Sequence, residues 1–143
     1  MKTCNEVMTK NPTCCLSSDP ISKAATLMKN EDVGSIPVIE NEDTKKLIGI
    51  VTDRDLALQT LPNERNAKSM TVVDVMTHEV ITCNENDDVQ KAIDLMATHQ
   101  LRRIPIVDLN HSIVGIISQA DIATRMNKTE ETAEMVKEIS QPS

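Results

Sequence analysis

The stretch LIGIVTDRDLA (residues 47–57) recurs later in the chain as IVGIISQADIA (residues 113–123). Both stretches begin with an aliphatic run and change abruptly to a hydroxyl residue, which an aspartate follows three positions later. A hydroxyl and an acid at this spacing form a capping box, here with aspartate instead of the usual glutamate, in which each side chain hydrogen-bonds to the backbone of the other residue at a helix start. The sequence therefore predicts a strand that turns directly into a helix in both places. The four polar residues are Thr52, Asp55, Ser118 and Asp121.

An internal repeat surrounds these stretches. Residues 7–40 align without gaps with residues 75–108, and both segments start with Val-Met-Thr and contain an Ile-Pro pair. At 143 residues the chain fits one ordinary domain, and each copy alone is small for an independent core. The offset is longer than that of solenoid repeats and there are only two copies, so the sequence predicts a closed pair and not an extended array.

Each copy has the same predicted order of elements: strand, helix, strand, strand, helix. Apolar residues recur at helical spacing over residues 21–28 and 89–96, which predicts an amphipathic helix in each copy. Asp19, before Pro20, and the equivalent Asp87 are predicted to cap these helices. The remaining predicted elements are short strands at 37–39 and 105–107, second strands at 47–51 and 113–117, a linker at 58–74 and a helix within 127–143.

The composition excludes several classes of partner. The net charge of -7 argues against binding to a nucleic-acid polymer or an anionic membrane, because both require a basic protein surface. No apolar run approaches the roughly 18 residues of a membrane span, and the N-terminal residues do not resemble a signal peptide, so a cytoplasmic location is predicted. Because the chain contains no Phe, Tyr or Trp, a bound planar base must lie against aliphatic side chains or peptide planes.

The four cysteines are predicted to be reduced, buried apolar residues. They form no C-x-x-C motif and, with three scattered histidines, offer no zinc-ligand spacing, so no metal site is predicted. A thiol-linked regulatory role through Cys14, Cys15 or Cys83 is the alternative.

No catalytic group stands out in the sequence. None of His78, His99 and His111 has a counterpart in the other copy or an evident acid or nucleophile partner. The chain has three glycines and contains neither the G-x-x-x-x-G-K-[ST] nor the G-x-G-x-x-G loop that cradles phosphate groups. The sequence therefore predicts binding and not catalysis.

The two Thr/Ser-x-x-Asp segments have two interpretations. As capping boxes they need no ligand. As binding sites, the unpaired amides and the positive end of a helix attract phosphate, and the short carboxylate can hold vicinal ribose hydroxyls. The residues alone leave both interpretations open.

The combination of a Val-Met-Thr start, an Ile-Pro strand and a Gly-hydrophobic-hydrophobic-Thr/Ser-x-x-Asp segment, present twice over residues 7–123, resembles the cystathionine-beta-synthase (CBS) domain. The chain is similar to a free-standing CBS pair, or Bateman module. This resemblance implies an α+β fold in which two CBS motifs, related by a pseudo-twofold axis, pack through their sheets. The first motif is expected at residues 1–66 and the second at residues 67–143, with a C-terminal helical tail.

The resemblance also implies a set of ligands and contact residues. Family members often hold adenosine-containing ligands in two clefts between the motifs, so the expected ligand is AMP, ADP, ATP, S-adenosylmethionine, NADH or a cyclic dinucleotide, with no required cofactor. In the family the hydroxyl faces ribose or phosphate, the acid binds ribose, an aliphatic residue lines the base, and an arginine near the shared proline contacts phosphate. The residues carried over are Ile50, Thr52 and Asp55 in the first copy and Arg102, Arg103, Ile116, Ser118 and Asp121 in the second.

Two functional hypotheses from different classes follow. The first is a regulatory sensor, in which an adenosyl ligand changes how the module contacts an unidentified regulated protein. The second is a ligand-free interaction or dimerisation module whose Thr/Ser-x-x-Asp segments only cap helices. Similar modules often form homodimers, so a homodimer is expected. The first copy has Gly34 and Ser35 in place of Arg102 and Arg103, so phosphate contacts are expected to come from the second copy.

Overall fold

The computed structural model of the chain describes residues 2–125, except for the side chains of residues 64–66. The chain divides into two compact units. Unit 1 consists of Met1–Pro12 together with Ile81–Ser143, and unit 2 consists of Thr13–Val80. The helix predicted within residues 127–143 lies outside the described residues.

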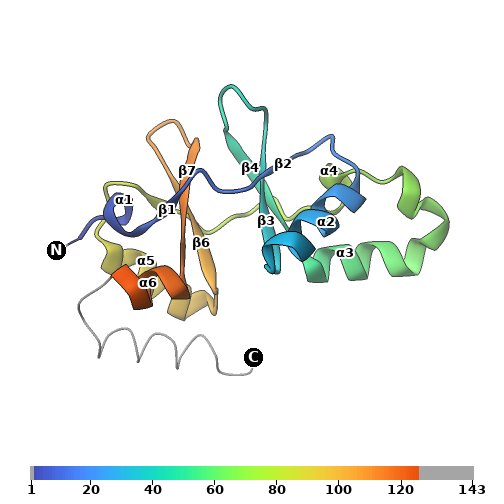
Figure 1. Cartoon of the computed structure of the whole chain (residues 1–143). Helices are drawn as coiled ribbons and strands as arrows, with labels where there is room; N and C mark the ends of the chain where they lie inside the picture. Colours follow the sequence, from blue (N-terminus) through green and yellow to red (C-terminus); the bar gives the residue numbers. More distant parts are fainter. Residues whose placement is uncertain (1, 126–143) are drawn as a thin grey trace. The chain divides into compact units, whose positions relative to one another are not determined.

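Unit 2 contains a three-stranded sheet in the order β2-β3-β4 (Figure 1). Strands β2 and β3 are parallel, and β3 and β4 are antiparallel neighbours joined by a short polar turn. The elements of unit 2 are β2 (Cys15–Leu16), α2 (Ile21–Glu31), β3 (Ser35–Ile39), β4 (Leu47–Thr52), α3 (Asp53–Thr60), a 3-10 segment (Leu61–Ser69) and α4 (Val72–Val75).

Unit 1 repeats this arrangement and adds one edge strand, which gives the order β1-β7-β6-β5. Strands β5 and β6 are parallel, and β7 is antiparallel to both β6 and β1. The elements of unit 1 are α1 (Cys4–Val7), β1 (Thr9–Lys10), β5 (Cys83–Asn84), α5 (Val89–His99), β6 (Arg103–Val107), β7 (Ile113–Ser118) and α6 (Gln119–Arg125). The predicted order of strand, helix, strand, strand, helix is therefore confirmed in both copies.

Each Val-Met-Thr segment packs in the unit formed by the other copy. In unit 1, Thr9 lies opposite Ile116 in the antiparallel pair of β1 and β7. In unit 2, the N–H of Ile50 donates to the carbonyl of Thr77 at 2.9 Å, and the N–H of Thr77 donates back at 2.8 Å. The compact units therefore divide the chain differently from the expected motifs 1–66 and 67–143, because the Val-Met-Thr segment of each copy pairs with a strand of the other copy.

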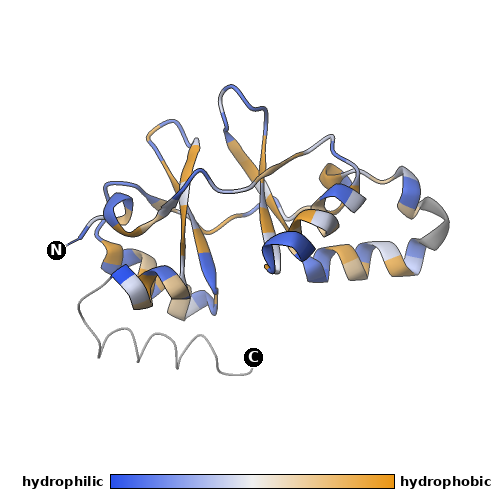
Figure 2. Cartoon of the chain, in the orientation of Figure 1, coloured by the Kyte–Doolittle hydropathy of each residue, from blue (hydrophilic) through white to orange (hydrophobic). Residues whose placement is uncertain are grey.

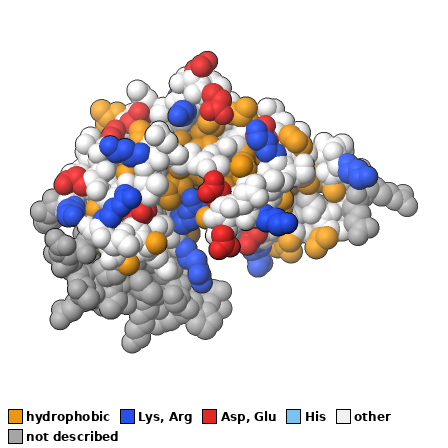
Figure 3. All heavy atoms as spheres, viewed as in Figure 1, with side chains coloured by type: hydrophobic (Ala, Val, Ile, Leu, Met, Phe, Trp, Pro, Cys, Tyr) orange, Lys and Arg blue, Asp and Glu red, His pale blue; other side chains and the backbone are white. Residues whose placement is uncertain are grey.

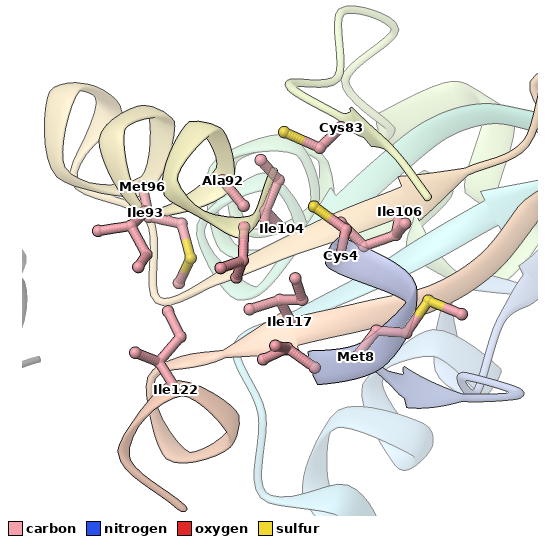
Figure 4. Packing of buried hydrophobic residues seen from close by; sticks show 12 residues of the cluster. Cys4, Met8, Cys83, Ala92, Ile93, Met96, Ile104, Ile106, Ile117 and Ile122 are labelled. Atoms are coloured by element: carbon pink, nitrogen blue, oxygen red, sulfur yellow. The ribbon is translucent and has the colours of Figure 1, made fainter. Parts of the chain in front are cut away.

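Each unit has its own core between its sheet and its helices. In unit 1 the short segment around α1 contributes Cys4, Val7 and Met8, which pack against strands β6 and β7 and helices α5 and α6 (Figure 4). In unit 2 the segment around α4 contributes Val72, Val75 and Met76 in the same way. Figure 2 shows that strands β3, β4, β6 and β7 are largely hydrophobic while the turns that join them are polar. Among the described residues, no helix is both long and apolar enough to span a bilayer.

The predicted caps of the long helices are wrong by one residue. Asp19 and Asp87 do not cap α2 and α5. The carboxylate of Asp19 accepts a hydrogen bond from the N–H of Leu16 at 2.8 Å, and that of Asp87 accepts one from the N–H of Asn84 at 2.9 Å. Helix α5 is capped by the next residue, Asp88, and α2 begins after a proline that offers no side-chain acceptor. Each aspartate instead closes the turn that follows a short strand, which satisfies a backbone donor three residues earlier.

The prediction of buried cysteines is confirmed for Cys4, Cys15 and Cys83 and is wrong for Cys14, which is partly exposed. None of the four cysteines forms a disulfide. Burial raises the pKa of the Cys15 thiol to about 12, and the pKa of Cys4 is raised by a hydrogen bond with Cys83 and by burial. Since the thiolate is the reactive form, both thiols remain protonated and inert near neutral pH.

We expect brief treatment with iodoacetamide at mildly alkaline pH to modify Cys14 first and to leave Cys4, Cys15 and Cys83 largely unmodified, because three of the four thiols are buried. Peptide mass spectrometry would measure the order of labelling. In denaturant all four cysteines should react at similar rates. Labelling of Cys15 as fast as that of Cys14 in the folded protein would contradict this assignment and favour a thiol-linked function.

Candidate functional site

The end of strand β4 forms the predicted capping box in unit 2. Thr52 is the N-cap of helix α3, and its hydroxyl accepts a hydrogen bond from the N–H of Asp55 at 2.9 Å. The Asp55 carboxylate accepts one in return from the N–H of Thr52 at 3.0 Å. These two bonds hold the carboxylate at the corner between strand and helix. The capping interpretation of this pair is therefore confirmed, and its role toward a ligand is a separate question.

Unit 1 has the same corner at the end of strand β7. The N–H of Asp121 donates to the hydroxyl of Ser118 at 3.1 Å, and the N–H of Ser118 donates to the Asp121 carboxylate at 3.0 Å. The two units thus position one carboxylate each by the same pair of backbone bonds.

A threonine hydroxyl from the Val-Met-Thr segments contacts each carboxylate. The Thr9 hydroxyl donates to Oδ1 of Asp121 at 2.8 Å. The Thr77 hydroxyl lies 3.2 and 3.3 Å from the two carboxylate oxygens of Asp55. The sequence analysis did not assign these threonines to the site, although their place in the shared Val-Met-Thr start was a usable signal.

Arg125 is a further residue that sequence reasoning missed. Its guanidinium donates to the carbonyl of Met8 at 2.7 Å and to that of Val7 at 3.0 Å. A second guanidinium nitrogen lies 4.0 Å from Oδ1 of Asp121. Arg125 therefore ties helix α6 to the segment that carries Thr9 and places a positive charge beside the carboxylate.

The predicted aliphatic residues lie next to these hydroxyls. Ile50 forms a bridge with Thr77, and Ile116 is the register partner of Thr9. Ile116 is 5% exposed, whereas Ile50 is half-buried. The structure therefore brings one aliphatic side chain, one carboxylate and two hydroxyl residues together in each unit.

The predicted arginines belong to the start of strand β6. Arg103 is half-buried and lies directly opposite Ser118 in the β6–β7 pair. Arg102 is exposed, and its carbonyl accepts a hydrogen bond from the N–H of Gln119 at 3.1 Å. Gly34 and Ser35 occupy the same backbone positions in unit 2, so the arginines distinguish the two units at otherwise equivalent places.

The electrostatic surroundings of the two carboxylates differ. Asp121 is 8% exposed, while Asp55 is only half-buried. Hydrogen bonds to a charged group are stronger where water is excluded, so Asp121 is the stronger acceptor site. A carboxylate can accept about four hydrogen bonds, and the bonds described above leave acceptor capacity in both units.

The described residues offer no evident metal centre, and the face seen in Figure 3 carries charges of both signs. Among them, no three His, Cys, Asp or Glu side chains cluster in a way that could hold a metal ion. Figure 3 shows Lys and Arg side chains interspersed with Asp and Glu side chains on the face in view.

Comparison with known proteins identifies the family. The CBS domain profile matches residues 4–59 and 72–128. The CBS domain-containing protein YhcV of Bacillus subtilis is 37% identical over 140 residues, which cover 98% of this chain and 96% of that protein. Hypoxic response protein I, solved with two coordinated zinc ions, is 28% identical with a TM-score of 0.74 over 88% of this chain and 100% of that chain. The CBS domain pair of protein MJ0100, solved with 5-methylthioadenosine and S-adenosyl-L-methionine, is 27% identical with a TM-score of 0.69 over 86% of this chain and 94% of that chain. The chain therefore belongs to the CBS domain family and contains a tandem pair of CBS domains.

Proposed function

We propose that the chain is a regulatory module that binds an adenine nucleotide or a related adenosyl compound at the corners that carry Asp55 and Asp121. The observation that supports this most is the repetition of one chemical arrangement. In each unit a threonine hydroxyl from the Val-Met-Thr segment contacts a carboxylate that a capping box holds at the end of a strand.

A fixed carboxylate of this kind suits a ribose ring. Two vicinal hydroxyls can donate to the two oxygens of one carboxylate, and hydrogen bonds to a charged acceptor are stronger than neutral ones. The backbone bonds of the capping box fix the orientation of the carboxylate before a ligand arrives, so less side-chain entropy is lost on binding. The Thr9 and Thr77 hydroxyls use their single donor on the carboxylate and add acceptor lone pairs at the same corner.

The aliphatic side chains are suited to the base. The chain has no aromatic residue, so an adenine ring must pack against side chains such as Ile50 and Ile116. The related CBS pair of MJ0100 was solved with 5-methylthioadenosine and S-adenosyl-L-methionine, which both contain adenine and ribose. That similarity supports an adenosine-containing ligand in this chain, among which AMP, ADP, ATP, S-adenosylmethionine and NADH are the candidates.

The second candidate function is a protein-interaction or dimerisation module. Leu58 and Leu61 in unit 2 are 56% and 68% exposed, and Val73 of α4 is also exposed. Leu109 of unit 1 is 90% exposed, so both units carry exposed apolar side chains, and such side chains mark contact surfaces where they form one patch. A homodimer and a regulated partner protein are therefore part of the proposal, with ligand binding as the signal that changes the contact. Four cysteines that form no disulfide support the proposed cytoplasmic location.

Replacement of either site carboxylate by asparagine is expected to weaken adenosyl-ligand binding without unfolding the protein. The asparagine oxygen can still accept the backbone bond of the capping box, but the negative charge toward ribose is lost. We expect a loss of about 1.5 to 3 kcal/mol in binding free energy, larger for Asp121→Asn than for Asp55→Asn because Asp121 is more buried. Isothermal calorimetry with AMP, ATP and S-adenosylmethionine would measure it.

Two controls separate this outcome from the alternatives. The melting temperature of each ligand-free variant should stay close to that of the wild type. The protein has no aromatic side chains, so near-ultraviolet absorbance of a nucleic-acid-free preparation reports directly on a copurified adenine ligand. Equal affinities of wild type and Asp121→Asn would refute the ribose contact. No binding of any adenosyl compound would favour the interaction module.

A further inference from the structure

The residue that follows the capping hydroxyl differs in charge between the two units. It is Asp53 in unit 2 and Gln119 in unit 1. The N–H of Asp53 donates to the carbonyl of Gly34 at 2.9 Å, and the N–H of Gln119 donates to the carbonyl of Arg102 at 3.1 Å. The two side chains therefore leave the backbone at equivalent points of equivalent corners.

Asp53 places a second negative charge at the corner of unit 2. Its side chain is exposed, and its Oδ1 accepts a hydrogen bond from the N–H of Arg54 at 2.8 Å. A Cβ atom added to Gly34 would lie 3.2 Å from Asp53 Oδ2, so the carboxylate covers the start of strand β3. An anionic group bound beside Asp55 would therefore have two carboxylates as neighbours, which disfavours it.

Gln119 has a buried side-chain donor without a partner in the described part of the chain, at the start of helix α6 in unit 1. Its Nε2 atom is buried and has no hydrogen-bond partner among the described residues. A buried donor without an acceptor is unfavourable. Phosphate oxygens are strong acceptors, so a phosphorylated ligand at this corner would satisfy the amide, whereas a carboxylate at this position would repel the ligand.

More basic residues lie near Gln119 in unit 1 than near Asp53 in unit 2. Unit 1 has arginines at the start of strand β6 and on helix α6, where unit 2 has uncharged residues. Unit 2 has one arginine, next to Asp53 in the chain, where unit 1 has alanine. The corner of unit 1 therefore carries more positive charge than that of unit 2, and the replacement of Asp53 by Gln119 adds to this difference. The aligned pairs are Arg102 with Gly34, Arg103 with Ser35, Arg125 with Gln59 and Ala120 with Arg54.

We propose that the residue after the capping hydroxyl selects the ligand of each unit. Gln119 makes unit 1 a site for phosphorylated adenosyl compounds, and Asp53 makes unit 2 a site for uncharged or cationic adenosyl compounds. This proposal rests on the proposed function, because it assigns a ligand class to each of the same two corners. The physical basis is that like charges at close range repel, while an amide donor and arginines attract phosphate.

The test uses two nearly isosteric exchanges, Gln119→Glu and Asp53→Asn, in the full-length protein. Calorimetry measures the binding of AMP and of adenosine. Asp55→Asn weakens ligand binding in unit 2 when unit 1 is tested, and Asp121→Asn weakens it in unit 1 when unit 2 is tested. We expect Gln119→Glu to weaken AMP binding in unit 1 about tenfold and Asp53→Asn to strengthen AMP binding in unit 2 about tenfold, since one charge changes at close range to phosphate. Adenosine affinity should change less than about twofold in both variants, and the AMP effect should shrink at high salt.

The outcomes separate the selector from the underlying function. If the ratio of AMP affinity to adenosine affinity is the same in wild type and in both charge variants, the residue after the capping hydroxyl does not select the ligand. The proposed adenosyl binding would still stand. No binding of either compound to any protein, wild type included, overturns the proposed function instead. If melting curves show that Gln119→Glu is unfolded, Gln119→Met, which removes the donor without adding a charge, replaces it and is expected to lower AMP affinity selectively. Asp53→Asn keeps the acceptor for Arg54 and tests unit 2 by itself.

Discussion

Residues 1–70 and 71–143, expressed as separate fragments, are expected to be unfolded or to form homodimers. Each fragment lacks the Val-Met-Thr segment that completes its own unit. Unit 1 would lose the buried side chains of Cys4, Val7 and Met8 from its core. Full burial of one aliphatic side chain contributes about 1.5 to 3 kcal/mol, so the loss approaches the total stability of about 5 to 15 kcal/mol of a typical domain.

Circular dichroism and light scattering on each fragment would measure the effect. Mixing the two fragments should restore the far-ultraviolet spectrum and the cooperative melt of the intact chain, because each fragment supplies the segment that the other lacks. Two fragments that are independently stable monomers would show that the exchanged segments are dispensable. That result would contradict the pairing of β1 with β7 and of Ile50 with Thr77 as a requirement for folding.

Gly115→Ala and Gly49→Ala are expected to destabilise the protein strongly, because a methyl group at either position would collide with the exchanged segments. A Cβ atom on Gly115 would lie 2.9 Å from the carbonyl oxygen of Thr9, and one on Gly49 would lie 2.9 Å from that of Thr77. Both atoms belong to backbone that is hydrogen-bonded to the same strand, so neither can move without loss of those bonds. We expect each substitution to lower the unfolding free energy by about 1 to 3 kcal/mol.

Gly34→Ala is the matched control for these substitutions. A Cβ atom there would meet only the Asp53 carboxylate, at 3.2 Å, and this flexible group can move aside. Urea denaturation of the three variants gives the comparison. If Gly34→Ala costs as much as Gly115→Ala, the loss reflects a general effect of replacing glycine with alanine and not the close approach of the exchanged segment.

Much of the local structure could be predicted from the sequence. Short apolar runs on either side of polar turns correctly located strands β3, β4, β6 and β7, and apolar residues at helical spacing correctly located helices α2 and α5. The capping boxes at Thr52 and Ser118 were also predictable, since both partners of each bond lie within four residues. The internal repeat identified the two copies as equivalent folding units. The CBS resemblance then led to the family that the comparisons confirm.

Local competition explains why the helix caps were predicted one residue too early. Asp19 and Asp87 each have a choice between the first amides of the following helix and the amide three residues before them. Both carboxylates bond backward, and in the second copy Asp88 caps the helix instead. The sequence pattern contains both options, and only the path of the turn after the short strand decides between them.

The tertiary structure alone decided which segments complete which unit. Thr9 meets Asp121, and Thr77 meets Asp55, across separations in the chain that no local pattern spans. Arg125 reaches the carbonyl of Met8 for the same reason. Such contacts depend on the strand edge with which each Val-Met-Thr segment pairs. Both copies offer nearly the same edge, so the sequence does not show which of the two is used. The sequence determined the two corners and their carboxylates, because short-range hydrogen bonds form them. The exchange of segments adds the second hydroxyl to each corner, and long-range strand pairing and core packing determined it.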